Sequence, residues 1–424
     1  MSSPESAASA PERGPRPVGP LQLLALGVNG IVGVGIFFLP APAAASAPGL
    51  GVVAVFALTG LALVPAALTF ATLGKRFDED GGPVVFARAA FGERASFLVG
   101  WVAYVSALFS TAAVVVGLTR SVLPATGDGG LARVAPALLV SLLAGVVASG
   151  LRLSARVWTS LTVLKLLPLV LLVGALGLAW GGLPAPPAAA PNASWFRAAL
   201  TVTFACQGFE IVPVIAGQVR ASSRAVPFAT VGSLVLAIAL YVALVLACVT
   251  ALPALASSSA PLADTAAVLG GVSLSRLVAA GTSVSALGIA FGMMVTTPRY
   301  LSAFAAGGRE LYALDRVSAS GVPTRALAVT WLVVSVLVSL GDLGELFALS
   351  SIAVLLQFGT SALALLVLAV RRERGLGPRQ AWPAVPTLAV AAVLVASGAT
   401  AREALVAAGA VLLGVGLLRL SRPR

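Results

Sequence analysis

Long apolar stretches follow one another along the whole chain, separated by short polar segments. Most are long enough to cross the hydrocarbon core of a bilayer as a helix, which takes about 20 residues. They lack the period-two alternation of membrane β-barrel strands, and a helix satisfies its own backbone hydrogen bonds in lipid. The pattern predicts an all-α integral membrane protein with about 12 transmembrane helices. The predicted segments are 21–46, 50–74, 96–123, 132–150, 157–180, 196–218, 227–252, 276–305, 326–341, 346–370, 384–399 and 403–420.

The composition supports a membrane protein and removes several chemistries. Of the 424 residues, 59% are hydrophobic and only 10% are charged, against about 25% charged in soluble domains. The chain has no histidine, and its two cysteines, Cys206 and Cys248, both lie inside apolar stretches. We therefore expect no metal site and no cofactor. The buried inventory of acids, bases and nucleophiles is also too small for an enzyme.

The basic residues are distributed unevenly between alternate loops. With the N-terminus inside, 21 of the 27 lysines and arginines fall on the inner side, five fall on the outer side, and Lys165 lies within a span. This bias predicts cytoplasmic N- and C-termini, with residues 1–19 as a disordered tail. The net charge of +12 is then explained by topology and lipid contact, and nucleic acid is not an expected partner. Abundant arginine and scarce lysine favour a bacterial inner membrane.

Two ionisable residues lie at membrane depth. Lys165 is nine residues beyond Arg156 in the fifth segment, or about 13 Å deeper at about 1.5 Å per residue, and Glu210 lies inside the sixth segment. Such groups are costly in lipid and indicate function, with a structural ion pair or brace as the alternative.

The first and sixth segments carry helix-breaking residues that a plain spanning helix does not need. The first reads LGVNGIVGVGIFFLPAPAA and the sixth reads TVTFACQGFEIVPVIAG. Glycine costs about 1 kcal/mol relative to alanine in a helix interior and proline about 3 kcal/mol, so we predict that both helices are broken. Close packing through small residues is the alternative explanation for the glycines.

Broken backbone at this depth suits a zwitterionic ligand. Freed N–H groups and the positive end of a half-helix favour a carboxylate, and freed carbonyls favour an ammonium group. The two broken segments are five helices apart, as in transporters built from inverted repeats. An amino acid, which carries both charges, is the ligand that this arrangement predicts.

Four stretches resemble the amino acid/polyamine/organocation transporter superfamily, and within it the amino acid permeases. NGIVGVGIFFLPAPAA is similar to its first-helix signature, and FDEDGGPVVFARAAFGERASFLVGW to its loop between helices two and three. TFACQGFEIVPVIAGQVRASSRAVPFAT resembles its sixth helix with the following loop. TTPRYLSAFAAGGRELYALDRVSASGVPTRALAV resembles its eighth helix and the loop into the ninth.

This resemblance implies a LeuT-type fold of five plus five inverted helices with broken helices 1 and 6 and two extra C-terminal helices. The implied units are 20–180, 195–370 and 384–424. The amides of Gly33, Val34, Gly35 and Ile36 would bind the substrate carboxylate, and carbonyls near Ile31 and Phe204 its ammonium. Cys206, Gly208 and Glu210 complete the implied site on the sixth helix, and Val34 and Cys206 depart from the usual motif.

Further candidates concern the substrate side chain and ion coupling. Tyr104 on the third helix, and Phe291 and Met293 on the eighth, are candidates for the side-chain pocket, although such residues often face lipid. Lys165 resembles the fifth-helix lysine of sodium-independent members, which stands in place of a sodium ion. A fixed cation repels sodium, so we expect proton coupling or exchange, with Lys165 as the titrating group that bridges the first and eighth helices near Ser283 or Ser285.

The sequence thus predicts a secondary active transporter of amino acids, with protons as coupling partner and small neutral or hydrophobic substrates favoured. A cationic amino acid or polyamine exchanger is the main alternative. A channel, a membrane-embedded enzyme and a substrate sensor fit less well, because neither a filter sequence nor a catalytic cluster is present. Oligomeric state, monomer or homodimer, stays open.

Overall fold

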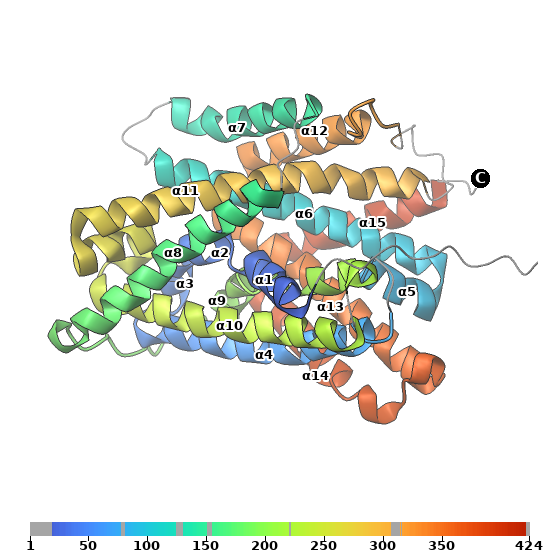
Figure 1. Cartoon of the computed structure of the whole chain (residues 1–424), viewed down its shortest axis with the longest axis horizontal. Helices are drawn as coiled ribbons and strands as arrows, with labels where there is room; N and C mark the ends of the chain where they lie inside the picture. The colour runs from blue at the N-terminus through green and yellow to red at the C-terminus, as the bar shows by residue number, and fades with distance from the viewer. Residues whose placement is uncertain are drawn as a thin grey trace, which may run out of the picture.

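A computed structural model describes residues 19–77, 81–123, 130–150, 155–219, 222–306, 314 and 316–420. All of its regular elements in these ranges are helices, and the long ones run side by side along one direction of the molecule (Figure 1). Residues 1–18 of the predicted tail lie outside the described residues.

The α-helices follow in chain order. They are α1 (Pro20–Ile31), α2 (Val34–Phe38), α3 (Pro40–Ser46), α4 (Leu50–Gly74), α5 (Pro83–Phe91), α6 (Glu93–Val122), α7 (Gly130–Ala148), α8 (Ala155–Ala179), α9 (Trp195–Thr203), α10 (Ser222–Ala251), α11 (Pro261–Ala306), α12 (Thr324–Leu340), α13 (Leu343–Val370), α14 (Ala384–Gly398) and α15 (Ala401–Leu420). Short 3₁₀ helices are η1 (Trp180–Gly182), η2 (Phe209–Gln218), η3 (Leu255–Ser257), η4 (Glu373–Gly375) and η5 (Pro378–Gln380).

Length and apolar composition make this a multi-pass membrane protein. In the described ranges, eight helical spans are long and apolar enough to cross a bilayer, and shorter apolar helices cover Arg133–Ala148, Thr324–Leu340 and Ala384–Gly398. Many large apolar side chains are exposed on the outside of the bundle, including Leu178 and Leu405. In a soluble protein such a surface would aggregate, whereas here it matches lipid.

Two elements differ from the sequence prediction. The range Pro261–Ala306 of α11 contains two helical stretches that meet at Gly271, whose φ of 71° is non-helical and accessible to glycine. The second stretch includes the helix expected at 276–305, and the first, which begins at Pro261, was not predicted; proline is favoured in the first turn of a helix. The loop expected between the second and third spans contains α5.

The first helix packs against α10 and η2 with Leu23, Gly27 and Ile31 buried, and its other side is exposed. Next to it, the ring of Phe70 on α4 lies 5.9 Å from Phe209 on η2 and 5.5 Å from Phe358 on α13, both edge to face. All three rings are fully or almost fully buried. This aromatic contact fixes the segment after the second interruption against two long, regular helices.

Candidate functional site

The first helical segment is interrupted within its glycine-rich run. α1 ends at Ile31, Val32 and Gly33 leave the helical conformation, and α2 resumes at Val34. The Gly33 N–H turns back to the Ile31 carbonyl at 2.7 Å, and no side chain caps the new helix. The first amides of a helix have no intrahelical acceptor, so the N–H groups at the start of α2 point their partial positive charge into the gap.

The second interruption lies between α9 and η2. Residues 204–208 form consecutive turns, with Ala205 N donating to Val202 O at 2.9 Å and Gln207 N to Phe204 O at a long 3.4 Å. Gly208 follows with a φ of +124°, which L side chains rarely adopt. Its N–H donates to a Glu210 carboxylate oxygen at 2.8 Å, so this break supplies its own cap.

The two interruptions touch through backbone. A Cβ placed on Gly208 would lie 2.5 Å from the carbonyl carbon of Gly30, and one on Gly35 would lie 2.6 Å from Cα of Ala205. Both distances are shorter than real contacts allow, so these positions require glycine. This close packing is what the alternative explanation of the glycines predicted, and it occurs together with the breaks.

A buried tyrosine joins the two interruptions. The Tyr241 hydroxyl, from α10, donates its one proton mainly to the Ile31 carbonyl at 2.7 Å and also lies 3.2 Å from the Ala205 carbonyl. The Ile31 carbonyl therefore already accepts from Gly33 and Tyr241, which uses both of its lone pairs. The Ile31 carbonyl, which the sequence predicted to receive a substrate ammonium, is thus already engaged, whereas the Phe204 carbonyl accepts only the long bond from Gln207 among the described contacts.

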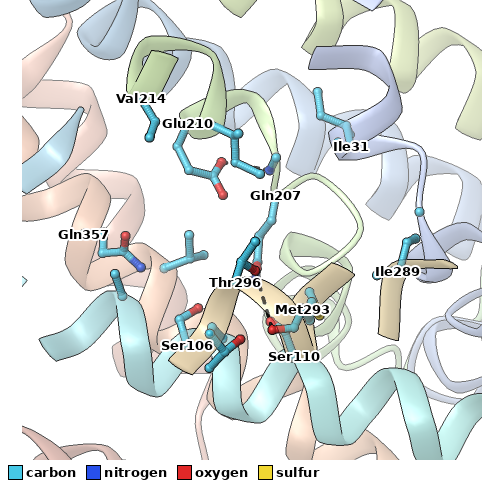
Figure 2. Close-up of a pocket in the computed structure, with 18 of the residues that line it drawn as sticks. Ile31, Ser106, Ser110, Gln207, Glu210, Val214, Ile289, Met293, Thr296 and Gln357 are labelled. Atoms are coloured by element: carbon cyan, nitrogen blue, oxygen red, sulfur yellow. Dashed lines mark hydrogen bonds between the residues drawn. The ribbon is translucent and has the colours of Figure 1, made fainter. Parts of the chain in front are cut away.

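A cavity of about 390 Å³ lies beside both interruptions. This volume falls within the roughly 300–1,000 Å³ of small-molecule sites. Its walls come from both breaks, the start of α5, one face of α6 and faces of α11 and α13 (Figure 2). The described lining residues are Gly30, Ile31, Gly33, Val34, Gly35, Gly81, Pro83, Val84, Ala103, Ser106, Ala107, Ser110, Phe204, Gln207, Gly208, Glu210, Ile211, Val214, Ile289, Met293, Thr296, Thr297, Tyr300, Val354 and Gln357.

One wall of the cavity is a neutral hydrogen-bonding surface. Ser106 and Ser110 on α6 and Gln207 on the second break reach it, and Figure 2 shows their side chains pointing toward the space below Glu210. The Ser110 and Ser350 hydroxyls lie 2.7 Å apart, and the Ser350 hydroxyl donates to Gln207 Oε1 at 3.3 Å. Gln207 Nε2 is buried without a described partner. Its free N–H groups are available to a ligand.

The charge inside the cavity is limited. Among the described lining residues, Glu210 is the only one with a formally charged side chain, and its carboxylate already accepts from Gly208. Backbone and hydroxyl groups supply the remaining polarity. This set of groups suits a small ligand that is neutral overall.

Lys165 lies outside the cavity, against the first helix. Its ammonium donates to the Asn29 carbonyl at 2.8 Å, and the side chain is almost fully buried. Ser285 on α11 has a buried hydroxyl without a described partner. Ser283 instead lines a separate small cavity with Phe37. The structure thus brings Lys165 to the first helix but gives no hydrogen bond between it and either serine.

Eight predicted residues line the cavity beside the two interruptions, called the main cavity below. They are Ile31, Gly33, Val34, Gly35, Phe204, Gly208, Glu210 and Met293.

Four predicted residues lie elsewhere. Ile36 and Cys206 are buried in packing contacts and do not line the cavity. Phe291 lies about 200° around α11 from the lining residues Ile289 and Met293, because each helical residue turns about 100°. Tyr104 points to α12, where its hydroxyl lies 3.2 Å from that of Thr330, and it lines a different cavity.

Sequence reasoning missed Tyr241 and the serine wall. A lone tyrosine in an otherwise apolar helix was the signal for Tyr241, since a buried phenol needs a hydrogen-bond partner. Ser106 and Ser110 are four residues apart in an apolar helix and so share one face. Their partner Ser350, more than 200 residues away, gives no sequence signal.

Comparisons with known proteins agree with this architecture. The family model described as amino acid permease matches residues 18–406. The chain is 29% identical over 426 residues to an uncharacterized transporter of Mycobacterium tuberculosis, covering 98% of this chain and 93% of the relative. It is 26% identical over 404 residues to the serine/threonine exchanger SteT of Bacillus subtilis, covering 90% of each. It is 24% identical over 371 residues to the vacuolar cationic amino acid transporter 2 of Arabidopsis thaliana, covering 82% of this chain and 58% of the relative. The chain therefore belongs to the amino acid permease family, within the amino acid/polyamine/organocation superfamily.

Proposed function

We propose that this permease is a secondary active transporter that carries amino acids by alternating access, with the substrate held between the two helix interruptions. One observation carries the proposal: both interruptions, five predicted spans apart, line the same cavity of about 390 Å³. Irregular backbone at membrane depth occurs where it faces protein or a polar cavity. A site that offers free amides on one side and carbonyls on the other fits a zwitterion.

The substrate takes a defined orientation in this proposal. Its carboxylate binds the free amides at the start of α2, around Val34 and Gly35. Its ammonium faces carbonyls of the second interruption, for which the weakly engaged Phe204 carbonyl is the best candidate. Its side chain extends toward Ser106, Ser110 and Gln207 on the opposite wall.

We favour a small neutral amino acid as substrate. The hydroxyl and carboxamide wall supports this choice, as does the engagement of Glu210 with Gly208. The relative SteT is named as a serine/threonine exchanger. A cationic amino acid or polyamine is the second candidate, supported by Glu210 in the cavity wall and by the Arabidopsis relative, named as a cationic transporter.

The proposed topology is the LeuT type, with twelve spans. The eight long helices, the three shorter apolar helices and the broken pair α9 and η2 supply these spans. The two inverted repeats then cover 20–180 and 195–370, and 384–424 holds the last two helices. Both termini lie in the cytoplasm of a bacterial cell in this proposal, because the basic loops gather on that side.

Counterflow in proteoliposomes tests the transport proposal. Vesicles that contain the purified protein and an unlabelled neutral amino acid should accumulate the labelled amino acid transiently and saturably. Protein-free vesicles are the control. A steady ion conductance without counterflow would instead identify a channel and contradict the proposal.

For coupling, we propose that Lys165 replaces a sodium ion and makes transport sodium-independent and proton-coupled or exchanging. Its buried contact with the Asn29 carbonyl supports this role. Lys165→Ala should reduce uptake at least about tenfold, because the cation that bridges α8 to α1 is lost. Uptake that depends on a sodium gradient and is unchanged in Lys165→Ala would contradict this coupling proposal.

A further inference from the structure

A second large cavity lies between α6, α11, α12 and α15, away from both helix interruptions. Its volume is about 490 Å³. α12 and α15 both pack against α6, and this cavity separates them. The described lining residues are Phe97, Trp101, Tyr104, Val105, Leu108, Phe109, Leu301, Leu314, Val329, Val333, Leu337, Ala410, Leu413 and Leu417.

The described walls of this cavity are entirely apolar. Trp101 and Tyr104 are its two residues with polar side-chain atoms, and both atoms bond to protein. The Trp101 Nε1–H donates to the Ala410 carbonyl at 2.8 Å, and the Tyr104 hydroxyl lies 3.2 Å from that of Thr330. Water in such a cavity would lack hydrogen-bond partners, and a void of this size is destabilising. The fitting occupant is therefore hydrocarbon.

The cavity is open to the membrane and matches one leaflet in depth. Val329 on α12 and Leu413 on α15 line it and are 40% and 57% exposed, so it reaches the lipid-facing surface between these helices. Along α6 it extends from Phe97 to Phe109, which is about 18 Å at about 1.5 Å per residue. Half of the roughly 30 Å hydrocarbon core is about 15 Å. An acyl chain of one leaflet therefore fits its length.

Positive charge marks one end of the cavity. Arg94 is one turn before Phe97 on the same face of α6. Arg419 lies at the end of α15, about 200° around that helix from Leu417, so it reaches this end of the cavity through its long, flexible side chain. Both arginines are exposed, and neither forms an ion pair with a described residue. The neighbouring Glu93 is paired with Arg88 at 3.1 Å.

We propose that this cavity binds an anionic phospholipid, with one acyl chain between α6, α12 and α15 and the headgroup phosphate at Arg94 and Arg419. The lipid belongs to the leaflet at the end of α6 that carries Arg94. Binding here ties α15 to α6 and is independent of the substrate proposed for the main cavity. Each arginine near the surface contributes about fivefold to anionic-lipid binding, so two give about 25-fold.

Fluorescence of Trp101 tests this proposal, because its ring lines the cavity. A variant that keeps Trp101 alone, with the other five tryptophans replaced by phenylalanine, is reconstituted in phosphatidylcholine vesicles. Phosphatidylglycerol with brominated acyl chains is compared with brominated phosphatidylcholine at equal, low mole fraction. We expect the anionic lipid to quench Trp101 several-fold more strongly. Unchanged thermal unfolding and counterflow identify variants that fold.

Two pairs of variants make the test specific. Replacing Arg94 and Arg419 by glutamine should remove the preference for the anionic lipid, whereas Arg133→Gln with Arg276→Gln, two exposed arginines elsewhere, should keep it. Val333→Phe, which fills the cavity, should reduce quenching by both lipids, whereas Val336→Phe, outside the lining, should not. Equal quenching by both lipids, or no quenching, would overturn the proposal. Quenching that falls as the protein concentration rises would also overturn it, because a second copy of the protein would then cover the cavity.

Discussion

The two helix interruptions differ in where the hydrogen-bond partners of their freed backbone groups come from. The first spans only Val32 and Gly33 and depends on distant partners: Tyr241 from α10 binds the Ile31 carbonyl, and Lys165 from α8 binds the Asn29 carbonyl. The second spans residues 204–208 and is closed mainly within its own segment, through successive turns and the Glu210 cap on Gly208. Its distant contacts are from Tyr241 to the Ala205 carbonyl and from Ser350 to Gln207.

Broken backbone inside a membrane needs a hydrogen-bond partner for each freed N–H and C=O group. The comparison shows that these partners can come from the same segment or from another helix. A local cap is encoded within a few residues, so it moves with its break. A distant partner ties the break to another helix, so a movement of α10 changes both interruptions through Tyr241, whereas a movement of α8 changes the first through Lys165. The first break is therefore the more dependent of the two on the positions of other helices.

The largest expected effect comes from the point where the breaks touch. Gly208→Ala places a methyl group 2.5 Å from the Gly30 carbonyl carbon in a conformation with positive φ. Strain and overpacking each cost about 1–3 kcal/mol, so we expect a loss of about 2–6 kcal/mol in stability and no transport. Chemical denaturation and counterflow measure this.

A matched glycine provides the control for that variant. Gly145→Ala lies in α7, where an added Cβ meets nothing within 4 Å. It should leave stability unchanged or raise it by up to about 1 kcal/mol, because alanine favours a helix. Equal behaviour of the two variants would mean that the interruptions do not depend on close contact.

The shared tether should have the next largest effect. Tyr241→Phe removes the hydroxyl whose single proton is shared between the Ile31 and Ala205 carbonyls, and should cost about 1–2 kcal/mol. Thr69→Val is the control, because the buried Thr69 hydroxyl also makes two contacts, with Pro65 and Thr387, and none of the three residues lines the cavity. Both variants should lower stability, but only Tyr241→Phe should weaken substrate binding. Similar substrate affinities in the two would show that the tether has no part in the site.

The smallest effect is expected at the local cap. Glu210→Gln keeps an acceptor for the Gly208 N–H and loses only the charge assistance, so we expect a cost of about 1 kcal/mol or less and a small change in neutral amino acid uptake. Glu210→Ala leaves the buried N–H unpaired and should cost about 1–3 kcal/mol. Abolished uptake in Glu210→Gln, with normal stability, would instead assign Glu210 to a cationic substrate.

Much of the architecture was predictable because the membrane restricts it. Apolar stretches of about the right length predicted the helices, and clustered glycine and proline predicted the positions of both interruptions. Sequence did not predict the helical stretch that begins at Pro261 or that α5 is helical, since each is about ten residues long or less and too short to span a bilayer. Apolar patterning detects helices of spanning length, and it misses shorter ones.

The site was predictable where the backbone determines it. Gly33, Gly35 and Gly208 line the cavity because the breaks place them there. Side chains chosen by type alone do not all reach the cavity: Tyr104 is on the same helix as Ser106 and Ser110 but lines a different cavity. The contact between Ser110 and Ser350 joins helices far apart in sequence, so it required the packed structure.

The central claim is that the cavity between the interruptions holds an amino acid by its carboxylate and its ammonium. Thermal unfolding of the purified protein against all amino acids and common polyamines tests this most directly, because a ligand at about 100 times its Kd stabilises the folded state by about 2.7 kcal/mol. We predict stabilisation by small neutral amino acids, and none by their amides or decarboxylated amines. Stabilisation by polyamines or by the decarboxylated amines, with no response to the amino acids, would contradict the account.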